Sequence, residues 1–312
     1  MDSIAKANHH SHLPNQIRFH QPIPDHYRPS RHWSNILIPP HLSSRSDVID
    51  HFKRKFYQRY IVRTPSPPLH STVTVYACSL SKAAALQSQG AHLASSPSEV
   101  ASRSDVVFTM VGHPSHVRSI VLESQGRGIL AGLGPGRVMV DTTTSDPALA
   151  REIFGAARAK ECWSVDSPVS GGDIGARDGK LAIFAGGDEG VVDWLSPLYG
   201  VMGKVTYMGK AGCGQSCKIA NQIVVGANLL GLSEGLVFTE KAGLDVRQFM
   251  NAVRGGAAGS MALELFGERM IGRDFRPGGF AEYMVKDMDF VEENENERGV
   301  PVLSFIYFLK RD

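Results

Sequence analysis

GRVMVDTTTSDPALAREIFGAARAK, residues 136–160, decides the fold class of this 312-residue chain. Its first part, residues 136–144, is a short segment rich in apolar and β-branched residues, of the length of a strand. Asp146 then stands where a helix N-cap is expected and Pro147 in the first turn, ahead of a stretch with helical character. A strand that runs directly into a capped helix is the repeating unit of an α/β fold.

The same alternation continues on both sides of this unit. Strand-like segments are TVTVYA (72–77), VVFTMV (106–111), WSVDSPV (163–169) and LAIFAGG (181–187). Helix-like segments are SKAAALQSQG (81–90), PSHVRSIVL (114–122) and VVDWLSPLYGVMG (191–203). Strands alternating with helices of this length predict a mostly parallel, doubly wound sheet of the Rossmann type, with helices on both faces. We assign this domain to residues 72–208.

From residue 213 onward the pattern becomes helical. QSCKIANQIVVGANLLGLSEGLVFTEKAG contains no proline and ends at Gly243, a residue suited to the end of a helix. Such a helix is a rod roughly 40 Å long, enough to link two domains and to form the spine of the second. We therefore expect an all-helical domain at residues 209–312, after the α/β domain.

The first 71 residues differ in composition from the rest. No glycine precedes Gly90, whereas nine of the 12 histidines and nine of the 17 prolines lie in the first 70 residues. Without sustained periodicity this segment is predicted to be poorly structured. A mitochondrial transit peptide is rich in Arg and Ser and poor in acids, and four early aspartates count against one. Mitochondrial and cytoplasmic locations therefore both stay open.

Overall composition excludes several classes of partner. The net charge of +2 gives no reason to expect nucleic acid or another polyanion. No run of 18 or more apolar residues occurs, so no membrane span is expected. Four cysteines in a chain of this length do not make a disulfide framework, which fits a reducing compartment.

The stretch GCGQSCKIANQ (212–222) admits three interpretations. As a phosphate loop it fails, because no Walker pattern is present, Cys217 replaces the third small residue of a dinucleotide turn, and no strand is expected to end directly into it. As a metal site it fails as well, because Cys213 and Cys217 lack two further Cys or His ligands nearby, so no metal is expected. The remaining interpretation centres on Lys218.

On a helix, Lys218, Asn221 and Gln222 project to one side. A lysine enclosed in an interdomain cleft loses hydration, its pKa falls toward neutrality, and it can exchange a proton with a substrate oxygen. The alternative is an exposed lysine on an amphipathic helix.

Two further stretches follow strands. Ser170, Gly171 and Gly172 form either a tight turn or a loop whose backbone N–H groups face an anion. The threonine row at 142–144 either caps the next helix or hydrogen-bonds a ligand.

Four motifs in order carry a family resemblance. DSPVSGG (166–172) with its following glycines, GKAGCGQSCKIANQ (209–222), KAGLD (241–245) and YMVKDMDF (283–290) resemble the β-hydroxyacid dehydrogenase family. Plant 3-hydroxyisobutyrate dehydrogenase-like proteins are the most similar, with tartronate semialdehyde reductases as relatives. The semialdehyde reductases share the Asn-Gln pair at 221–222, whereas the related 6-phosphogluconate dehydrogenases have His at the position of Asn221.

The resemblance implies an NAD- or NADP-dependent oxidoreductase that moves a hydride between the nicotinamide and a small hydroxyacid, similar to 3-hydroxyisobutyrate, or its semialdehyde. Lys218 then corresponds to the catalytic general acid and base. The other implied roles are the substrate-carboxylate loop for Ser170, Gly171 and Gly172, substrate positioning for Asn221 and Gln222, and cofactor contacts for Thr144 and Lys286. The resemblance also implies that residues 72–208 bind the dinucleotide, that residues 209–312 serve substrate binding and dimerisation, and that the protein is a homo-oligomer.

The sequence departs from the family at its beginning and near its end. Relatives begin with a strand and a G-x-G-x-x-G turn for the pyrophosphate, and this chain has no glycine there. Ala77-Cys78 stands where relatives carry Asn-Arg, and the helices that relatives add after residue 290 are not expected here. We therefore predict an incomplete sheet, in which WSNILIPP (33–40) or QRYIVRT (58–64) substitutes for the first strand, and weakened cofactor binding.

Two alternatives to an active enzyme follow from these departures. One is a truncated, catalytically impaired or inactive paralogue. The other is a chromatin reader of the same fold, which would need a histone- or DNA-recognition module that the first 71 residues do not resemble.

Overall fold

The computed structural model describes residues 36–37, 73–76, 80–88, 90–123, 125–274, 284–287 and 290. Apart from β1, the predicted poorly structured segment 1–71 lies outside these residues, as does the end of the chain after residue 290.

Most of the described strands form one sheet with the order β1-β4-β5-β6-β8-β7, and β9 pairs with β8. Its strands are β1 (Ile36–Leu37), β4 (Val106–Thr109), β5 (Val138–Asp141), β6 (Trp163–Asp166), β7 (Val169–Ser170), β8 (Leu181–Gly186) and β9 (Gly203–Gly209). β1, β4, β5 and β6 are parallel, whereas β8 runs antiparallel to β6 and β7. β2 (Thr74–Val75) and β3 (His92–Leu93) form a separate parallel pair. The predicted Rossmann-type sheet is thus confirmed, with an antiparallel extension.

β1 occupies the place beside β4 that the missing first strand would leave open. Ile36 pairs with Val106 and Leu37 with Val107, in parallel register. Of the two predicted substitutes, WSNILIPP therefore supplies the strand beside β4. Pairing at this edge gives the backbone groups of β4 hydrogen-bond partners that an open edge would lack.

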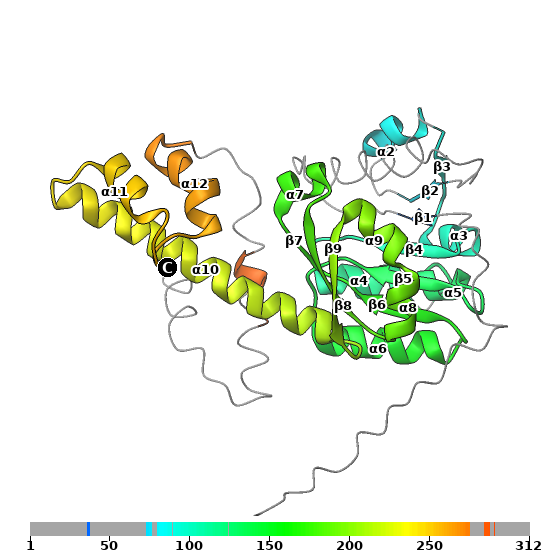
Figure 1. Cartoon of the computed structure of the whole chain (residues 1–312). Helices are drawn as coiled ribbons and strands as arrows, with labels where there is room; N and C mark the ends of the chain where they lie inside the picture. The colour runs from blue at the N-terminus through cyan, green and yellow to red at the C-terminus, as the bar shows by residue number, and fades with distance from the viewer. Residues whose placement is uncertain are drawn as a thin grey trace, which may run out of the picture.

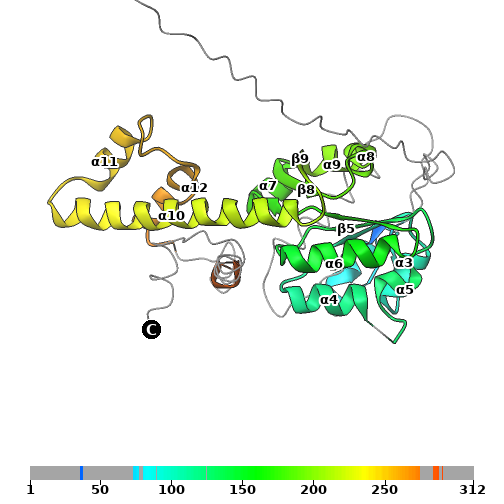
Figure 2. The same ribbon diagram turned by 90° about the horizontal axis from the view of Figure 1, so that it is seen from below.

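Helices cover both faces of the sheet (Figures 1 and 2). Those packed on one face are α3 (Pro97–Ser102), α4 (Pro114–Leu122), α5 (Ile129–Gly132) and α6 (Pro147–Arg158). Those on the other face are α8 (Glu189–Trp194) and α9 (Ser196–Met202). The remaining helices of this part are α2 (Leu80–Gln87) and α7 (Gly172–Asp178). Asp146 caps α6 by accepting hydrogen bonds from the N–H groups of Ala148 and Leu149, as its position in the sequence predicted.

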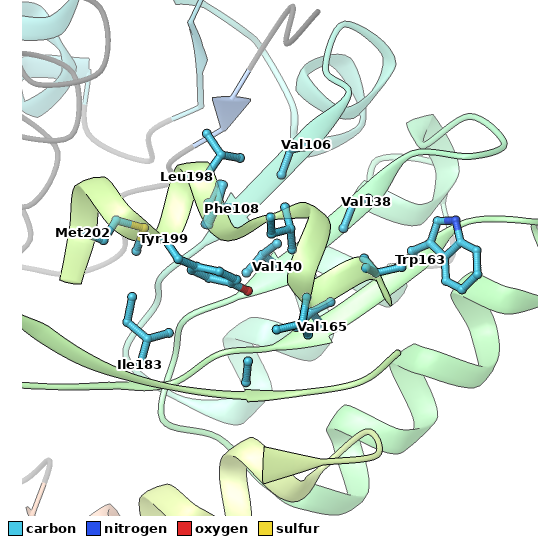
Figure 3. Close-up of a cluster of buried hydrophobic side chains, with 14 of the residues drawn as sticks. Val106, Phe108, Val138, Val140, Trp163, Val165, Ile183, Leu198, Tyr199 and Met202 are labelled. Carbon is cyan, nitrogen blue, oxygen red and sulfur yellow. The ribbon is translucent and has the colours of Figure 1, made fainter. Parts of the chain in front are cut away.

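The core consists of two layers because successive strand residues point to opposite faces. Val106 and Phe108 of β4 pack in the cluster under α8 and α9, whereas Val107 packs in the cluster under α3–α6. Figure 3 shows Tyr199 and Leu198 of α9 against the sheet residues of the first cluster. The Tyr199 hydroxyl group lies 2.6 Å from Ser167 Oγ, which satisfies it in the interior.

Two expectations were wrong near residues 191–209. The predicted single helix is divided into α8 and α9, because Pro197 lacks an N–H group and its ring conflicts with the preceding helical turn. β9 then follows, which sequence patterning missed. Its parallel pairing with β8 requires a glycine at 203, since a Cβ there would lie 2.0 Å from the Leu181 carbonyl oxygen.

The long helix is confirmed as α10 (Cys213–Lys241), a rod that leaves the sheet and carries α11 (Val246–Val253) and α12 (Met261–Ile271) along its far half (Figures 1 and 2). By length and composition alone α10 would suffice to cross a membrane, and 22% of its apolar window is buried. Such a helix is weak evidence for a membrane span, because core helices of soluble proteins share these properties. Val237 and Phe238 are among its exposed side chains.

Candidate active site

Lys218 lies in the second turn of α10 and is 7% exposed. Its Nζ donates a 2.8 Å hydrogen bond to Gln222 Oε1, which also accepts a 2.9 Å bond from Asn221 Nδ2. The predicted grouping of these three side chains is therefore confirmed. Burial lowers the pKa of Lys218 to about 8; the Asp287 carboxylate opposes this change and the Lys286 charge adds to it. The alternative of an exposed surface lysine was wrong.

Asp287 belongs to the same group, and sequence analysis missed it. It is 4% exposed and its Oδ2 accepts a 2.7 Å hydrogen bond from Gln222 Nε2. Its Oδ1 lies 3.2 Å from Lys286 Nζ. A continuous chain of polar contacts therefore joins Lys218 to Lys286 through Gln222 and Asp287. The acidic neighbour of Lys286 in the motif YMVKDMDF was the available signal.

Lys286 reaches from the helical residues 284–287 to the sheet. Its Nζ donates to the carbonyl oxygens of Gly112 at 3.3 Å and Thr144 at 3.0 Å. These carbonyls follow β4 and β5, at the carboxyl edge where doubly wound sheets bind ligands. The structure thus brings together Thr144 and Lys286, the two residues expected to contact the cofactor.

The three threonines at 142–144 differ in burial and in hydrogen bonding. Thr142 Oγ1 donates to the Thr109 carbonyl, and Thr143 Oγ1 accepts from the N–H group of Val111. Both are buried, whereas Thr144 is half-buried. Since Asp146 caps α6, none of these hydroxyl groups is needed as its cap, and a contact between Thr144 and the cofactor stays a prediction.

Ser170, Gly171 and Gly172 lie where β7 ends and α7 begins. Gly171 has φ = +126° and Gly172 φ = +59°, values that side-chain-bearing residues rarely adopt. Both glycines are exposed, and β7 contacts α10. The turn is therefore confirmed as glycine-dependent and lies beside the helix of Lys218, while its contact with a substrate carboxylate stays a prediction.

The glycines of GCGQSCK allow α10 to approach the sheet closely. A Cβ on Gly214 would lie 2.3 Å from the Phe184 carbonyl oxygen and 2.6 Å from that of Asp166. β9 ends at Gly209, shortly before the helix, which corrects the expectation that no strand leads into this stretch. Among the described residues, no three His, Cys, Asp or Glu side chains are grouped to hold a metal.

Two buried acidic residues occupy paired positions on neighbouring strands at this edge, Asp141 of β5 and Asp166 of β6. Burial raises the pKa of Asp141 to about 6, against hydrogen bonds from Thr109 and Thr143. Burial also raises the pKa of Asp166 to about 7, against hydrogen bonds from the N–H groups of Gly212 and Gln215. Within the part of the chain that the structure describes, neither carboxylate hydrogen-bonds to Lys218.

The residues at this edge fit one half of a dinucleotide. The carbonyls of Gly112 and Thr144, the half-buried threonine and the Lys286 ammonium supply the mixed donors and acceptors that a nicotinamide and its ribose need. The pyrophosphate half fits less well. IPP (38–40) follows β1 where a glycine turn is expected, and prolines carry no N–H group for phosphate oxygens; these three residues lie outside the described part of the chain.

Known proteins match both parts of the chain. The NAD-binding domain of 6-phosphogluconate dehydrogenase matches residues 70–209, and the NAD-binding region of NADP-dependent 3-hydroxyisobutyrate dehydrogenase matches residues 212–306. The probable mitochondrial 3-hydroxyisobutyrate dehydrogenase-like 3 of Arabidopsis thaliana is 58% identical over 222 residues, covering 71% of this chain and 69% of the relative. The chain belongs to the β-hydroxyacid dehydrogenase family.

More distant matches agree with this. The 2-hydroxy-3-oxopropionate reductase of Escherichia coli K12 is 38% identical over 65% of this dehydrogenase and 70% of the relative. A Mycobacterium tuberculosis 3-hydroxyisobutyrate dehydrogenase solved with L-serine shares the fold, with a TM-score of 0.73 at 23% identity over 86% of this chain and 89% of that one. This β-hydroxyacid dehydrogenase is thus an NAD(P)-dependent oxidoreductase of the 3-hydroxyisobutyrate dehydrogenase-like kind. The comparisons give no specific support to an inactive paralogue.

Proposed function

We propose that this dehydrogenase interconverts a small hydroxyacid and its semialdehyde, with Lys218 as the proton-transfer residue. The observation that carries the proposal is the burial of Lys218, which lowers its pKa to about 8 and thereby increases the fraction of neutral amine near physiological pH. A group with this pKa can take a proton from a hydroxyl group in oxidation and return it in reduction.

Gln222 and Asp287 position that proton. The Gln222 side chain accepts from Lys218 and donates to Asp287, so its amide orientation is determined at both ends. With Oε1 held toward Lys218, the ammonium group cannot rotate freely, and Asn221 lies beside it to orient a substrate oxygen. The nicotinamide, when bound, supplies or accepts the hydride.

The substrate carboxylate would be held by the turn at Ser170–Gly172. Its two glycines leave the backbone open to an anion, and no Cβ shields the N–H groups. Relatives named as 3-hydroxyisobutyrate dehydrogenase-like and as 2-hydroxy-3-oxopropionate reductase support a short hydroxyacid as the substrate class.

Turnover of Lys218→Ala tests the proposal. With 3-hydroxyisobutyrate or tartronate semialdehyde as substrate, we expect kcat to fall by about 10²–10⁴-fold, the range that a general acid or base contributes. Lys241→Ala, at the exposed far end of the same helix, is the matched control and should keep parental turnover. Unchanged turnover of Lys218→Ala would refute the assigned role.

We further propose a homo-oligomer built through the helical part of the chain. Large apolar side chains stay exposed on α10 and α12, among them Val224, Val237, Phe238 and Met261. Apolar surface of this kind is usually covered by another subunit. Light scattering coupled to size exclusion would show a mass of at least two chains, whereas a monomer at micromolar concentration would contradict the proposal.

We propose a mitochondrial rather than cytoplasmic location. The Arabidopsis relatives named as 3-hydroxyisobutyrate dehydrogenase-like are described as mitochondrial. A fluorescent protein fused after residue 71 should be imported into mitochondria, and diffuse cytoplasmic fluorescence would contradict this.

A further inference from the structure

Asp166 contacts the start of α10 from the sheet. Its Oδ1 accepts a 2.8 Å hydrogen bond from the N–H group of Gly212, and its Oδ2 accepts a 2.9 Å bond from that of Gln215. Gly212 is the N-cap residue of α10 and provides no side chain to cap its first turn. Asp166 lies on β6, 46 and 49 residues before these two positions in the sequence. Its carboxylate therefore accepts from N–H groups that the side chain of a neighbouring residue would otherwise cap.

Glycines allow this contact to be direct. A Cβ on Gly186 would lie 2.7 Å from the Gly214 nitrogen and 2.8 Å from Asp166 Oδ1. A Cβ on Gly214 would in turn lie 2.8 Å from Asp166 Oδ2. Side chains at either position would push the helix away from the carboxylate, so the geometry of this junction depends on their absence.

Gln215 makes a second, independent connection in the same turn. It is completely buried; its Oε1 accepts from the N–H group of Ser145 at 2.9 Å, and its Nε2 donates to the Thr143 carbonyl at 2.8 Å. These two partners flank Thr144, the threonine placed for the cofactor. The first turn of α10 is thus attached both to the end of β6 and to the loop after β5.

Lys218 lies three residues after Gln215, so these connections determine where its Nζ projects. We propose that Asp166 and Gln215 are positioning residues for proton transfer: they attach the start of α10 to the sheet and thereby set the place and hydration of Lys218 relative to Thr144. Neither residue touches the reacting atoms. The inference rests on the proposed role of Lys218 and adds two residues that act through it.

The test uses Asp166→Asn, which keeps the size of the side chain but replaces one acceptor oxygen by an NH₂ group facing a backbone N–H. Gln215→Ala is the second variant, in case the first does not fold. The matched control is Asp188→Asn, because Asp188 is an acidic cap in the same domain that accepts from the N–H group of Val191 in α8 rather than from α10.

Two readouts separate positioning from simple loss of stability. The first is kcat per folded enzyme, which should fall by about 10- to 100-fold in Asp166→Asn and Gln215→Ala, because a small misplacement of a reacting group costs this much. The second requires no cofactor: the pKa of Lys218, measured by competitive acetylation and mass spectrometry, should rise from about 8 toward its ordinary value as water reaches the amine. Asp188→Asn should change neither.

The outcomes distinguish this inference from the function on which it rests. If both variants melt at lower temperature but keep parental kcat and the parental Lys218 pKa, their residues are only structural and the inference is wrong. If Lys218→Ala itself retains turnover, the proposed function fails instead. Loss of kcat in Lys218→Ala, Asp166→Asn and Gln215→Ala, with Asp188→Asn active, supports both.

Discussion

Gln222 Nε2 donates a 2.7 Å hydrogen bond to Asp287 Oδ2, which connects the helix of Lys218 to a residue 65 positions later. This bond determines which end of the Gln222 amide faces Lys218, because an amide donates through nitrogen and accepts through oxygen. It also places the negatively charged Asp287 carboxylate beside Gln222, the side chain that Lys218 contacts. This charge raises the pKa of Lys218 and so opposes the larger lowering caused by burial.

Replacement of Asp287 by Asn should therefore lower the pKa of Lys218 further below about 8. In the parent, kcat/KM for hydroxyacid oxidation should increase with pH through about 8, since the neutral amine is the base. In Asp287→Asn this rise should move to lower pH, with reduced turnover because the hydrogen bond that orients Gln222 loses its charged acceptor. The pH profile of kcat/KM checks both. Asp274→Asn, which removes a carboxylate paired with Arg269 in α12, should keep the parental profile.

Lys218 should destabilise the fold at neutral pH. Its pKa in the folded chain, about 8, lies below the ordinary 10.5, so its contribution to stability is fully present above 10.5 and is lost as pH falls through about 8. Lys218→Met should thus increase the free energy of unfolding by about 2 kcal/mol at pH 7, while abolishing turnover. Urea unfolding at pH 7 and pH 10 measures the effect, which should shrink at the higher pH.

The exposed Lys241 provides the control for this comparison. Lys241→Met should leave the free energy of unfolding unchanged at both pH values, because a solvated lysine carries no burial cost. Equal effects of the two substitutions would show that added apolar surface, rather than relief of a buried amine, explains the result.

Gly214→Ala should disrupt the junction between α10 and the sheet. The new Cβ would meet backbone oxygen atoms of Phe184 and Asp166, which cannot move without shifting β6 or β8. We expect a loss of at least about 2 kcal/mol in the free energy of unfolding, at the upper part of the range for overpacking. Gly231→Ala, on an exposed turn of α10 where a Cβ meets nothing, should instead stabilise by about 0.5–1 kcal/mol.

Cofactor affinity should be weak, because the sequence after β1 contains prolines rather than a glycine turn for the pyrophosphate. Titration of NADH and NADPH by fluorescence should give a Kd in the millimolar rather than the micromolar range. Saturation at micromolar cofactor would show that other residues hold the pyrophosphate as well as the usual glycines do.

Local patterns predicted much of this protein. The helix predicted at PSHVRSIVL has the same bounds as α4, and the predicted N-cap Asp146 does cap α6. The proline-free run after residue 213 likewise forms the long helix α10. These features depend on neighbours within one or two turns. The grouping of Lys218 with Gln222 was predictable for the same reason, since residues four apart share one side of a helix.

Contacts between distant segments were decided by the tertiary structure alone. Sequence patterning did not show that Asp287 joins Gln222, that Asp166 caps α10, or that β9 pairs with β8. It also left two candidates for the strand beside β4, and the structure uses Ile36–Leu37. The physical reason is that burial and hydrogen bonding at these places come from residues tens of positions apart. Sequence alone determined that a lysine stands on a long helix after a Rossmann-type domain, and only packing made that lysine buried and oriented and lowered its pKa.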